Sequence, residues 1–458
     1  MANDAAGPPG PAPDVRQPWS RSERRLPRVV LQPLQSFLHT EAAGGVLLLA
    51  ATAVALVWAN SPWEGSYDRL WETELTIGLG RWHLTHDLAH WVSDGLMTLF
   101  FLVVGLEIKR EVVTGELRDP RAAAVPVLAA LGGMVVPALL FLAVAAGSEG
   151  GDGWGIPMAT DIAFALGILT LVARSAPASL KPFLLTLAIV DDIGAILVIA
   201  IFYSGGVSVE PLLIALGTCA AIVLLQRIHI RAAAVYVVLG VILWVAISES
   251  GVHPTIAGVV LGLLTPSVPF QRPETVSEEA HRVADETVDD PDPPDVDAAY
   301  WLYLAGLSRE AVSPLARVES ILHPWVSFVI VPLFALANAG VDLSVGALSD
   351  AATSTVALGI VLGLVVGKPL GIALATALAV RSRLGPLPAG ARWRDVVGVG
   401  AVAGIGFTIS LLITDLAFEG SPILEPAKAG ILAASVLAGV VGATILTGRR
   451  ETRAGGAE

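Results

Sequence analysis

The centre of the chain reads Thr186-Leu-Ala-Ile-Val-Asp191-Asp192-Ile-Gly-Ala-Ile-Leu-Val-Ile-Ala-Ile-Phe-Tyr203. A run this long and this apolar spans a membrane when it forms one helix. Two adjacent carboxylates lie near its middle, where a charged aspartate costs roughly 2.5–3.5 kcal/mol on insertion scales. We therefore expect Asp191 and Asp192 to be functional, and infer that they bind and release a small cation and protons.

The composition places the chain among membrane proteins. Its 458 residues are 54% hydrophobic and only 15% charged, whereas soluble domains carry about 25% charged residues. The net charge of -13 comes from acidic loops, so we expect no nucleic-acid partner. Cys219 is the single cysteine, which excludes an internal disulfide and makes a thiolate metal site improbable.

Windows of about 19 residues predict an all-α polytopic protein with about twelve transmembrane helices. The predicted spans lie near 38–59, 92–112, 123–146, 154–173, 182–204, 209–226, 232–249, 251–266, 321–340, 355–380, 395–418 and 426–447.

The basic residues predict the orientation of these spans. With both termini in the cytoplasm, Arg69, Arg81 and Lys428 fall outside and Lys368 falls within a span, while all others of the 28 Lys and Arg lie on the cytoplasmic side. This distribution obeys the positive-inside rule and supports an even number of spans.

The predicted spans divide the chain into five regions. The acidic, Pro-rich part of the inner loop is typical of a disordered, solvated linker. The regions are a disordered cytoplasmic tail at 1–36, eight spans over 37–266, an acidic cytoplasmic loop at 267–320, four spans over 321–448 and a cytoplasmic tail at 449–458.

The longest outer loop contains an alternating polar and apolar segment at 72–84 around Gly78-Leu-Gly80. Alternation around a glycine turn predicts a small periplasmic β-hairpin. The exposed edge of a hairpin can pair with a copy of itself, so a homodimer through this hairpin is a hypothesis.

Four ionisable residues lie deep in predicted spans: Asp161, Asp191, Asp192 and Lys368. A structural ion pair could explain Lys368 and one aspartate but leaves two carboxylates over. Because consecutive helical residues point about 100° apart, one of Asp191 and Asp192 can face Lys368 while the other lines a cavity with Asp161.

Two predicted spans are poor helices. The fourth contains Gly155 and Pro157 before Thr160, and the eleventh has glycines at 398, 400, 404 and 406 before Thr408 and Ser410. The glycines alone are compatible with close helix packing. Weak helices in both halves of a chain also indicate discontinuous helices at a transport site. Their carboxylate, hydroxyl and carbonyl oxygens suit a hard cation such as Na⁺ or Li⁺.

These stretches closely resemble the NhaA family of bacterial sodium/proton antiporters. The matching motifs cover most of the span region. They include Phe100-Phe-Leu-Val-Val-Gly-Leu-Glu-Ile-Lys-Arg-Glu111, Ala159-Thr-Asp-Ile-Ala-Phe-Ala-Leu-Gly167, Ala188-Ile-Val-Asp-Asp-Ile-Gly-Ala195, Gly251-Val-His-Pro-Thr-Ile-Ala-Gly258, Leu322-His-Pro-Trp325, Gly367-Lys-Pro-Leu-Gly371 and Gly404-Ile-Gly-Phe-Thr-Ile-Ser410.

The resemblance implies inverted repeats, with the fourth and eleventh spans discontinuous and crossing at Gly404, Gly406 and Thr408. It implies that Asp192 is the principal Na⁺ ligand, with Asp191 and Thr160 beside it. Asp191 would carry a proton and pair with Lys368. Asp161 and Lys368 would balance the facing helix termini.

The resemblance also implies a pH-responsive cytoplasmic network. Ordinary surface pairing is the alternative for the group at the end of the second span, and capping or packing is the alternative for His253. Ser320 stands where the better-known members carry histidine, which puts the pH profile in doubt. The network would contain Glu107, Arg110, Glu111, His253, Glu319 and His323.

The expected function is electrogenic, pH-regulated exchange of Na⁺ or Li⁺ for protons by alternating access in the bacterial inner membrane. The bilayer, Na⁺ and H⁺ are the expected partners, and we expect no cofactor and no enzymatic activity. Two alternatives remain: a proton-coupled carrier of another cation or an organic solute, and an intramembrane aspartyl protease. The adjacency of Asp191 and Asp192 argues against the protease, which usually places its aspartates on separate helices.

Overall fold

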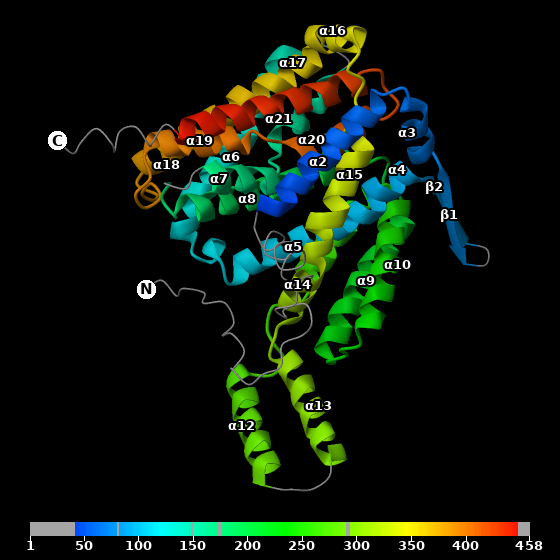
Figure 1. Ribbon diagram of the computed structural model, residues 1–458, viewed down its shortest axis with the longest axis vertical. Coiled ribbons are helices and arrows are strands. Elements are labelled where there is room, and N and C mark those ends of the chain that lie inside the picture. Colours follow the sequence, from blue (N-terminus) through cyan, green and yellow to red (C-terminus); the bar gives the residue numbers. More distant parts are fainter. Residues whose placement is uncertain are drawn as a thin grey trace, which may run out of the picture.

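The computed structural model describes residues 42–79, 82–145, 147, 150–172, 176–289 and 294–447. Both tails predicted to be disordered, 1–36 and 449–458, lie outside these residues. Helices make up nearly all of the regular structure, with one two-stranded sheet (Figure 1).

The elements follow one another along the chain in the order of their labels. The first half contains α2 (Ala42–Ala59), α3 (Glu64–Trp71), β1 (Glu74–Leu79), β2 (Trp82–Asp87), α4 (Leu88–His90), η3 (Trp91–Leu96), α5 (Met97–Val113), η4 (Glu116–Arg118), α6 (Pro120–Ala145), η5 (Gly151–Met158), α7 (Ile162–Val172), α8 (Leu180–Phe202), α9 (Val209–Arg227), α10 (Ala233–Glu249) and α11 (Thr255–Leu264). The second half contains α12 (Pro273–Asp289), α13 (Pro294–Glu310), α14 (Pro314–Trp325), η6 (Val326–Ile330), α15 (Val331–Asn338), α16 (Val345–Thr353), α17 (Thr355–Leu362), η7 (Gly363–Gly367), α18 (Lys368–Arg381), α19 (Trp393–Ala403), α20 (Phe407–Phe418) and α21 (Leu424–Thr447).

Long apolar helices make this a polytopic membrane protein. Within the described ranges, eight helices are long and apolar enough to cross a membrane, or up to ten when each of two sharply bent pairs counts as one span. Helices α10 and α11 are apolar but shorter. The Asp191–Asp192 stretch lies on α8, as the sequence predicted.

Small residues bring the central helices into close contact. Helix α6 packs on α8, α17 and α18, and α5 packs on α11. A Cβ added to Gly371 would lie 2.1 Å from the carbonyl oxygen of Gly132. Only glycine permits this approach, the general means by which helices associate closely in a bilayer.

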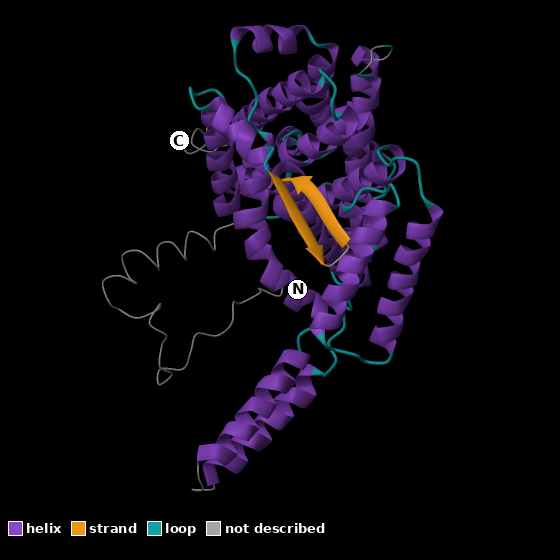
Figure 2. Ribbon diagram, turned by 90° about the vertical axis from the view of Figure 1, so that its right-hand side faces the viewer, coloured by secondary structure: helices purple, strands orange, loops and turns teal. Residues whose placement is uncertain are grey.

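Strands β1 and β2 are antiparallel, in register from Glu74 opposite Asp87 to Leu79 opposite Trp82 (Figure 2). The hydroxyl oxygens of Thr76 and Thr85 lie 2.8 Å apart across the pair. The sequence had ended this segment at residue 84, but β2 continues to Asp87, whose carboxylate accepts a hydrogen bond from the His90 amide at the start of α4.

The acidic loop differs from its prediction as a disordered linker. Helices α12 and α13 lie side by side and form an arm that projects from the body (Figures 1 and 2). Each begins with a proline, at Pro273 and Pro294, and proline is well tolerated in the first turn of a helix. Val276 and Val283 of α12 are buried. The prediction of disorder rested on the acidic, Pro-rich composition, but the described residues on either side of 290–293 form helices. Residues 290–293, at the centre of the acidic segment, lie outside the described residues.

Candidate ion-binding site at two helix breaks

The fourth and eleventh predicted spans are each interrupted, and the interruptions touch. The 3-10 helix η5 ends at Met158 and α7 begins at Ile162. Helices α19 and α20 are separated by residues 404–406 and bend by 46°. The Asp161 amide donates a hydrogen bond to the Ile405 carbonyl oxygen at 2.6 Å, joining the two breaks.

The Asp161 carboxylate accepts hydrogen bonds at the N-termini of α7 and α20. Its Oδ1 accepts from the Phe164 amide of α7 at 3.1 Å. Its Oδ2 accepts from both the amide, at 3.2 Å, and the hydroxyl, at 2.6 Å, of Thr408 in α20. Because helix N-termini carry unsatisfied N–H groups and partial positive charge, a carboxylate between two of them is favourably placed.

A hydroxyl group and an ammonium group lie at the C-terminal ends of α19 and η5. Lys368 Nζ donates to the carbonyl oxygen of Met158, the last residue of η5. Thr160 Oγ1 lies 2.9 Å from the carbonyl oxygen of Ala403, the last residue of α19. These carbonyls have no partner within a helix, so donors satisfy groups that a break leaves exposed.

Gly404 and Gly406 permit the close approach at the second break. A Cβ on Gly404 would lie 2.3 Å from the Leu364 carbonyl oxygen, and one on Gly406 would lie 2.2 Å from Ser410 Oγ. Ser410 Oγ in turn donates to the Ile156 carbonyl oxygen at 2.8 Å. The glycines of the eleventh span therefore bring α20 and η5 together.

Asp191 and Lys368 form a buried ion pair. Lys368 Nζ lies 2.7 Å from Asp191 Oδ2, and both side chains are completely buried. Thr160 Oγ1 lies 2.7 Å from the same oxygen. Lys368 directly follows η7, a π-helical turn, a feature that is frequent at functional sites.

Among the described residues, Asp192 takes no part in the hydrogen bonds of the Asp191–Lys368 pair. It is 4% exposed, and its Oδ1, like Asp191 Oδ1, is buried without a hydrogen-bond partner in the part of the chain that the structure describes. A buried carboxylate oxygen in this state is costly unless it is protonated or binds a cation. Within the same residues, no three His, Cys, Asp or Glu side chains gather to hold a metal ion. The orphaned oxygens therefore suit protons or a transient hard cation.

Comparison with known proteins identifies the family. The sequence model of a family described as Na⁺/H⁺ antiporter 1 matches residues 35–446. The chain belongs to the Na⁺/H⁺ antiporter 1 family.

Curated Na⁺/H⁺ antiporters align with almost the whole of this chain. Na⁺/H⁺ antiporter NhaA 2 of Sorangium cellulosum (strain So ce56) is 49% identical over 91% of this chain and 90% of its own. NhaA 3 of Frankia alni is 46% identical over 96% and 92%, and NhaA of Cupriavidus necator 46% over 94% and 92%.

The residues predicted to form the pH-responsive network lie near the adjoining ends of α5 and α14, with the exception of His253. Arg110 of α5 forms an ion pair with Glu319 of α14. Buried Glu111 instead accepts a hydrogen bond from the Glu116 amide at 3.2 Å. Glu107 is partly buried on α5, and His323 is exposed on α14. Only the Arg110–Glu319 contact joins two spans among these five residues.

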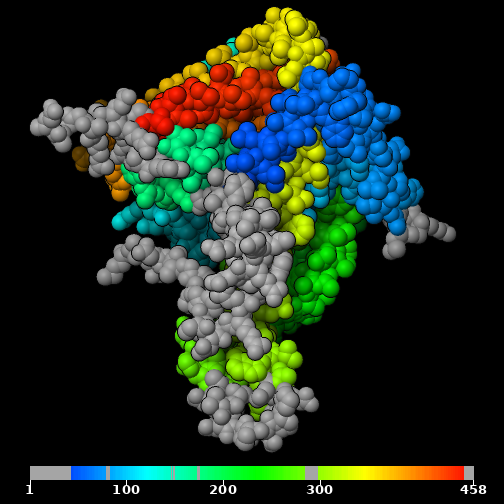
Figure 3. Space-filling model, viewed as in Figure 1, coloured from blue at the N-terminus to red at the C-terminus, as the bar shows by residue number. Residues whose placement is uncertain are grey.

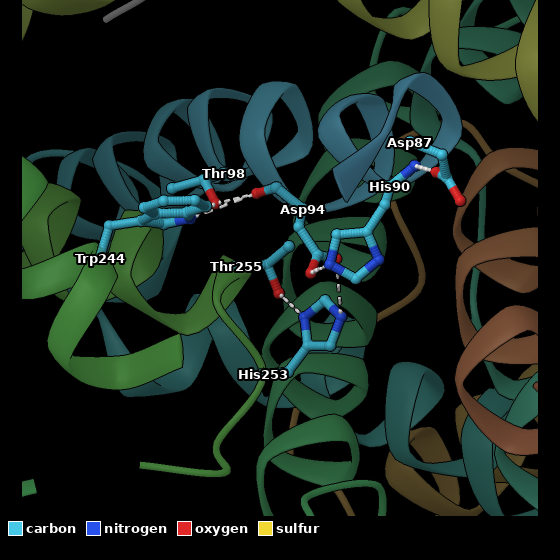
Figure 4. A network of polar contacts seen from close by, with 7 residues as sticks. All are labelled: Asp87, His90, Asp94, Thr98, Trp244, His253 and Thr255. Atoms are coloured by element: carbon cyan, nitrogen blue, oxygen red, sulfur yellow. Dashed lines mark hydrogen bonds and ion pairs between the residues drawn. The ribbon is translucent and has the colours of Figure 1, made fainter. Parts of the chain in front are cut away.

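His253 does not lie with this network, which corrects the sequence prediction. Its Nε2 lies 3.4 Å from Asp94 Oδ1, and its Nδ1 lies 2.7 Å from Thr255 Oγ1 (Figure 4). Asp94 precedes Glu107 by thirteen residues, roughly 20 Å along a helix. Gly258 of α11 lies against Thr98 and Gly262 lies against Gly105, so the start of α11 lies beside the start of α5 and not beside its cytoplasmic end.

Asp94 and His90 form a second polar cluster, which sequence reasoning missed. His90 Nε2 lies 2.9 Å from Asp94 Oδ2, so imidazoles from two segments hold the two oxygens of one carboxylate (Figure 4). We name His90, Asp94 and His253 the carboxylate clamp. The i,i+4 spacing of His90 and Asp94 in the sequence was the available signal.

Proposed function

We propose that this chain is a sodium/proton antiporter in which Na⁺ and protons compete for the carboxylates at the two helix breaks. The orphaned buried oxygens of Asp191 and Asp192 are the observation that carries this proposal. Asp192 is the principal Na⁺ ligand, with Thr160 and Asp191 beside it. Deprotonation makes these oxygens available to the cation, and reprotonation displaces it.

Lys368 supplies the charge balance in this mechanism. While it pairs with Asp191 it neutralises one carboxylate in the membrane interior. When Na⁺ or a proton takes its place on Asp191, the ammonium loses its counter-charge. Asp161 stays on the two helix N-termini and holds the breaks together.

Alternating access follows from the placement of the site between two broken helices. We infer twelve spans, with α10 and α11 as the two shorter ones, arranged as inverted repeats whose fourth and eleventh members cross. One bundle rocks against another and presents the loaded site to either side of the membrane. The three loops and tails at 1–36, 267–320 and 449–458 lie in the cytoplasm, and the β1–β2 hairpin lies on the periplasmic side of the inner membrane.

Two regulatory properties belong to the same proposal. Exchange is electrogenic, because more protons enter than sodium ions leave, and the membrane potential then drives it. The Arg110–Glu319 pair, with Glu107, Glu111 and His323 near the same end of α5 and α14, adjusts the activity to cytoplasmic pH.

The test is Asp192→Asn in everted membrane vesicles. The amide cannot lose a proton and contributes no negative charge, so we expect Na⁺-dependent proton movement to fall to the level of empty-vector vesicles. The matched control is Asp350→Asn, which makes the same change on an exposed residue of α16 and should leave exchange unchanged. Normal exchange in Asp192→Asn would refute the assignment of the site.

Purified protein in proteoliposomes separates sodium exchange from the alternatives. Proton flux is followed against Na⁺, Li⁺, K⁺, Ca²⁺ and organic cations in turn. Flux that responds to an organic cation but to neither Na⁺ nor Li⁺ would replace the proposal with a different proton-coupled carrier.

A further inference from the structure

The arm exposes four consecutive apolar side chains at residues 300–303 of α13, which we call the aromatic turn. Because neighbouring residues of a helix point about 100° apart, they surround the helix at this turn. Trp301 and Tyr303 of α13 are 51% and 53% exposed, and Leu302 between them is 74% exposed. Tyr300 adds a third exposed aromatic ring. Large exposed apolar groups gathered on one element mark an interaction surface more often than chance. The arm, yellow-green in Figure 3, extends below the body, and Figures 1 and 2 show α13 apart from the helices of the body.

The charge of the arm restricts which partner can bind over the aromatic turn. Residues 273–310 carry eleven acidic and two basic residues, a net charge of −9. The anionic inner leaflet repels such a surface, and so does the arm of a second copy. The occupant is therefore basic, and it carries groups that pack on aromatic rings.

A segment of this same chain has that chemistry. Residues 16–31 read Arg-Gln-Pro-Trp-Ser-Arg-Ser-Glu-Arg-Arg-Leu-Pro-Arg-Val-Val-Leu, with five arginines and one glutamate. Guanidinium groups bind carboxylates in a bidentate way and stack on aromatic faces. Trp19, Leu26 and Val29 add apolar contact area.

The base of the arm already uses this chemistry. Arg231, in the α9–α10 connection, lies 3.8 Å from the ring centroid of Phe270 and forms an ion pair with Glu310 at the end of α13. The Arg231 guanidinium therefore contacts an aromatic ring directly before α12 and a carboxylate at the end of α13. The tail arginines would make the same two kinds of contact at the aromatic turn of α13.

We propose that residues 16–31 dock on the acidic arm at the aromatic turn of α13. Only ten residues separate this segment from α2, and fully extended they span at most roughly 33–36 Å. In Figure 1 the first turn of α2, in dark blue, is the end of that helix nearer to the arm. The arm continues into α14, which carries Glu319, so docking connects the tail to the helix that pairs with Arg110.

Distances between spin labels in the full chain test the proposal. The labels are attached to Ser22→Cys in the tail and to the exposed Ser308→Cys on α13, in a Cys219→Ser background. Both labelling sites leave the arginines and the aromatic rings intact. The protein is reconstituted in zwitterionic nanodiscs and measured by double electron–electron resonance. We expect a short-distance population that disappears in about 1 M choline chloride, where the Debye length is about 3 Å. The matched control pairs Ser308→Cys with Thr452→Cys in the other basic tail, and should show no such population.

Substitutions at the surface define the contact. Trp301→Ser with Tyr303→Ser, and separately Arg24→Glu with Arg25→Glu, should each reduce the short-distance population to the control level. Exposed Val345→Ser on α16 should not reduce it. A short distance that survives both double substitutions overturns the proposal. So does one that requires anionic lipid, which places the tail on the membrane, or one seen between singly labelled chains, which places it on a second copy.

Discussion

Lys368 shows why the membrane interior favours exchange over permanent binding. A buried ammonium is costly unless a counter-charge and hydrogen-bond acceptors surround it, and here Asp191 and the Met158 carbonyl provide them. Buried ion pairs contribute little net stability, but removing one partner alone is strongly destabilising. In the proposed mechanism, a cation or proton that binds Asp191 therefore competes with Lys368.

Replacing Lys368 by alanine leaves Asp191 with Thr160 as its remaining hydrogen-bond donor. We expect Lys368→Ala to lose about 3–5 kcal/mol of stability, measured as a lower Tm in detergent. The control is Lys368→Met combined with Asp191→Asn, which removes both charges and should recover most of the loss. Equal losses in the single and double variants would contradict the pairing, as would an altered Na⁺/Li⁺ preference at unchanged pH response.

The buried ionisable residues of the site could be predicted from the sequence, whereas their hydrogen-bond partners could not. An apolar run makes an aspartate conspicuous, so Asp161, Asp191, Asp192 and Lys368 could be singled out from composition. The bond between Asp161 and Thr408 joins residues 247 positions apart, and no local pattern predicts it. Asp161 was expected to line a cavity with one of the two adjacent aspartates, but its oxygens bond to the N-termini of α7 and α20.

Among the elements, α5 and α11 are held together by glycine. A Cβ on Gly258 of α11 would lie 2.1 Å from the Thr98 carbonyl oxygen and 2.8 Å from the Leu102 amide nitrogen, both backbone atoms of α5. Alanine normally stabilises a helix relative to glycine by about 1 kcal/mol. Gly258→Ala should instead destabilise the protein by about 1–3 kcal/mol through overpacking.

The matched control for this prediction is Gly167→Ala. Gly167 lies inside α7, where an added Cβ meets nothing within 4 Å, so this substitution should be neutral or slightly stabilising. Thermal unfolding of both variants in the same detergent compares them. A Gly258→Ala protein as stable as Gly167→Ala would show that α5 and α11 are not in fixed contact.

The carboxylate clamp joins the start of the second span to the start of α11, and its two histidines share one partner. Removing either imidazole leaves the other to hold Asp94, so His90→Ala and His253→Ala should not act additively. A double-mutant cycle measured by thermal unfolding should give a coupling energy of about 0.5–3 kcal/mol. The same cycle repeated in an Asp94→Asn background should show a smaller coupling. Strict additivity in the original background would contradict a shared contact.

Element boundaries depended on context that the sequence did not reveal. The apolar spans were placed well, because a 20-residue hydrophobic run has few alternatives in a membrane protein. The arm was missed because its acidic, Pro-rich composition is typical of a solvated linker, although proline can also start a helix, as Pro273 and Pro294 do. The burial of Val283 in α12 depends on tertiary packing, which the sequence alone does not show.

At the scale of the whole molecule, the body and its extensions differ in packing. Buried helices surround the two breaks, while the arm and the β1–β2 hairpin project from the body in Figure 1. Each strand of the hairpin is paired on one side only. Because an unpaired strand edge is a template for another strand, the hairpin is the part of the body best suited to join two copies.

Deletion of residues 72–87 tests this role of the hairpin. If β1 or β2 pairs with its counterpart in a second copy, the deleted protein should run as a monomer in native mass spectrometry, while the intact protein is a dimer. The retained Tm of the deleted protein must show that the helices still fold, since the hairpin ends directly before α4. A gentler variant is Ile77→Pro, which removes one backbone donor from β1 and leaves the chain length unchanged. Ile77 is 55% exposed, so little packing is lost, and the proline should weaken pairing along the strand. Undiminished dimers in both variants would move the interface to the helices.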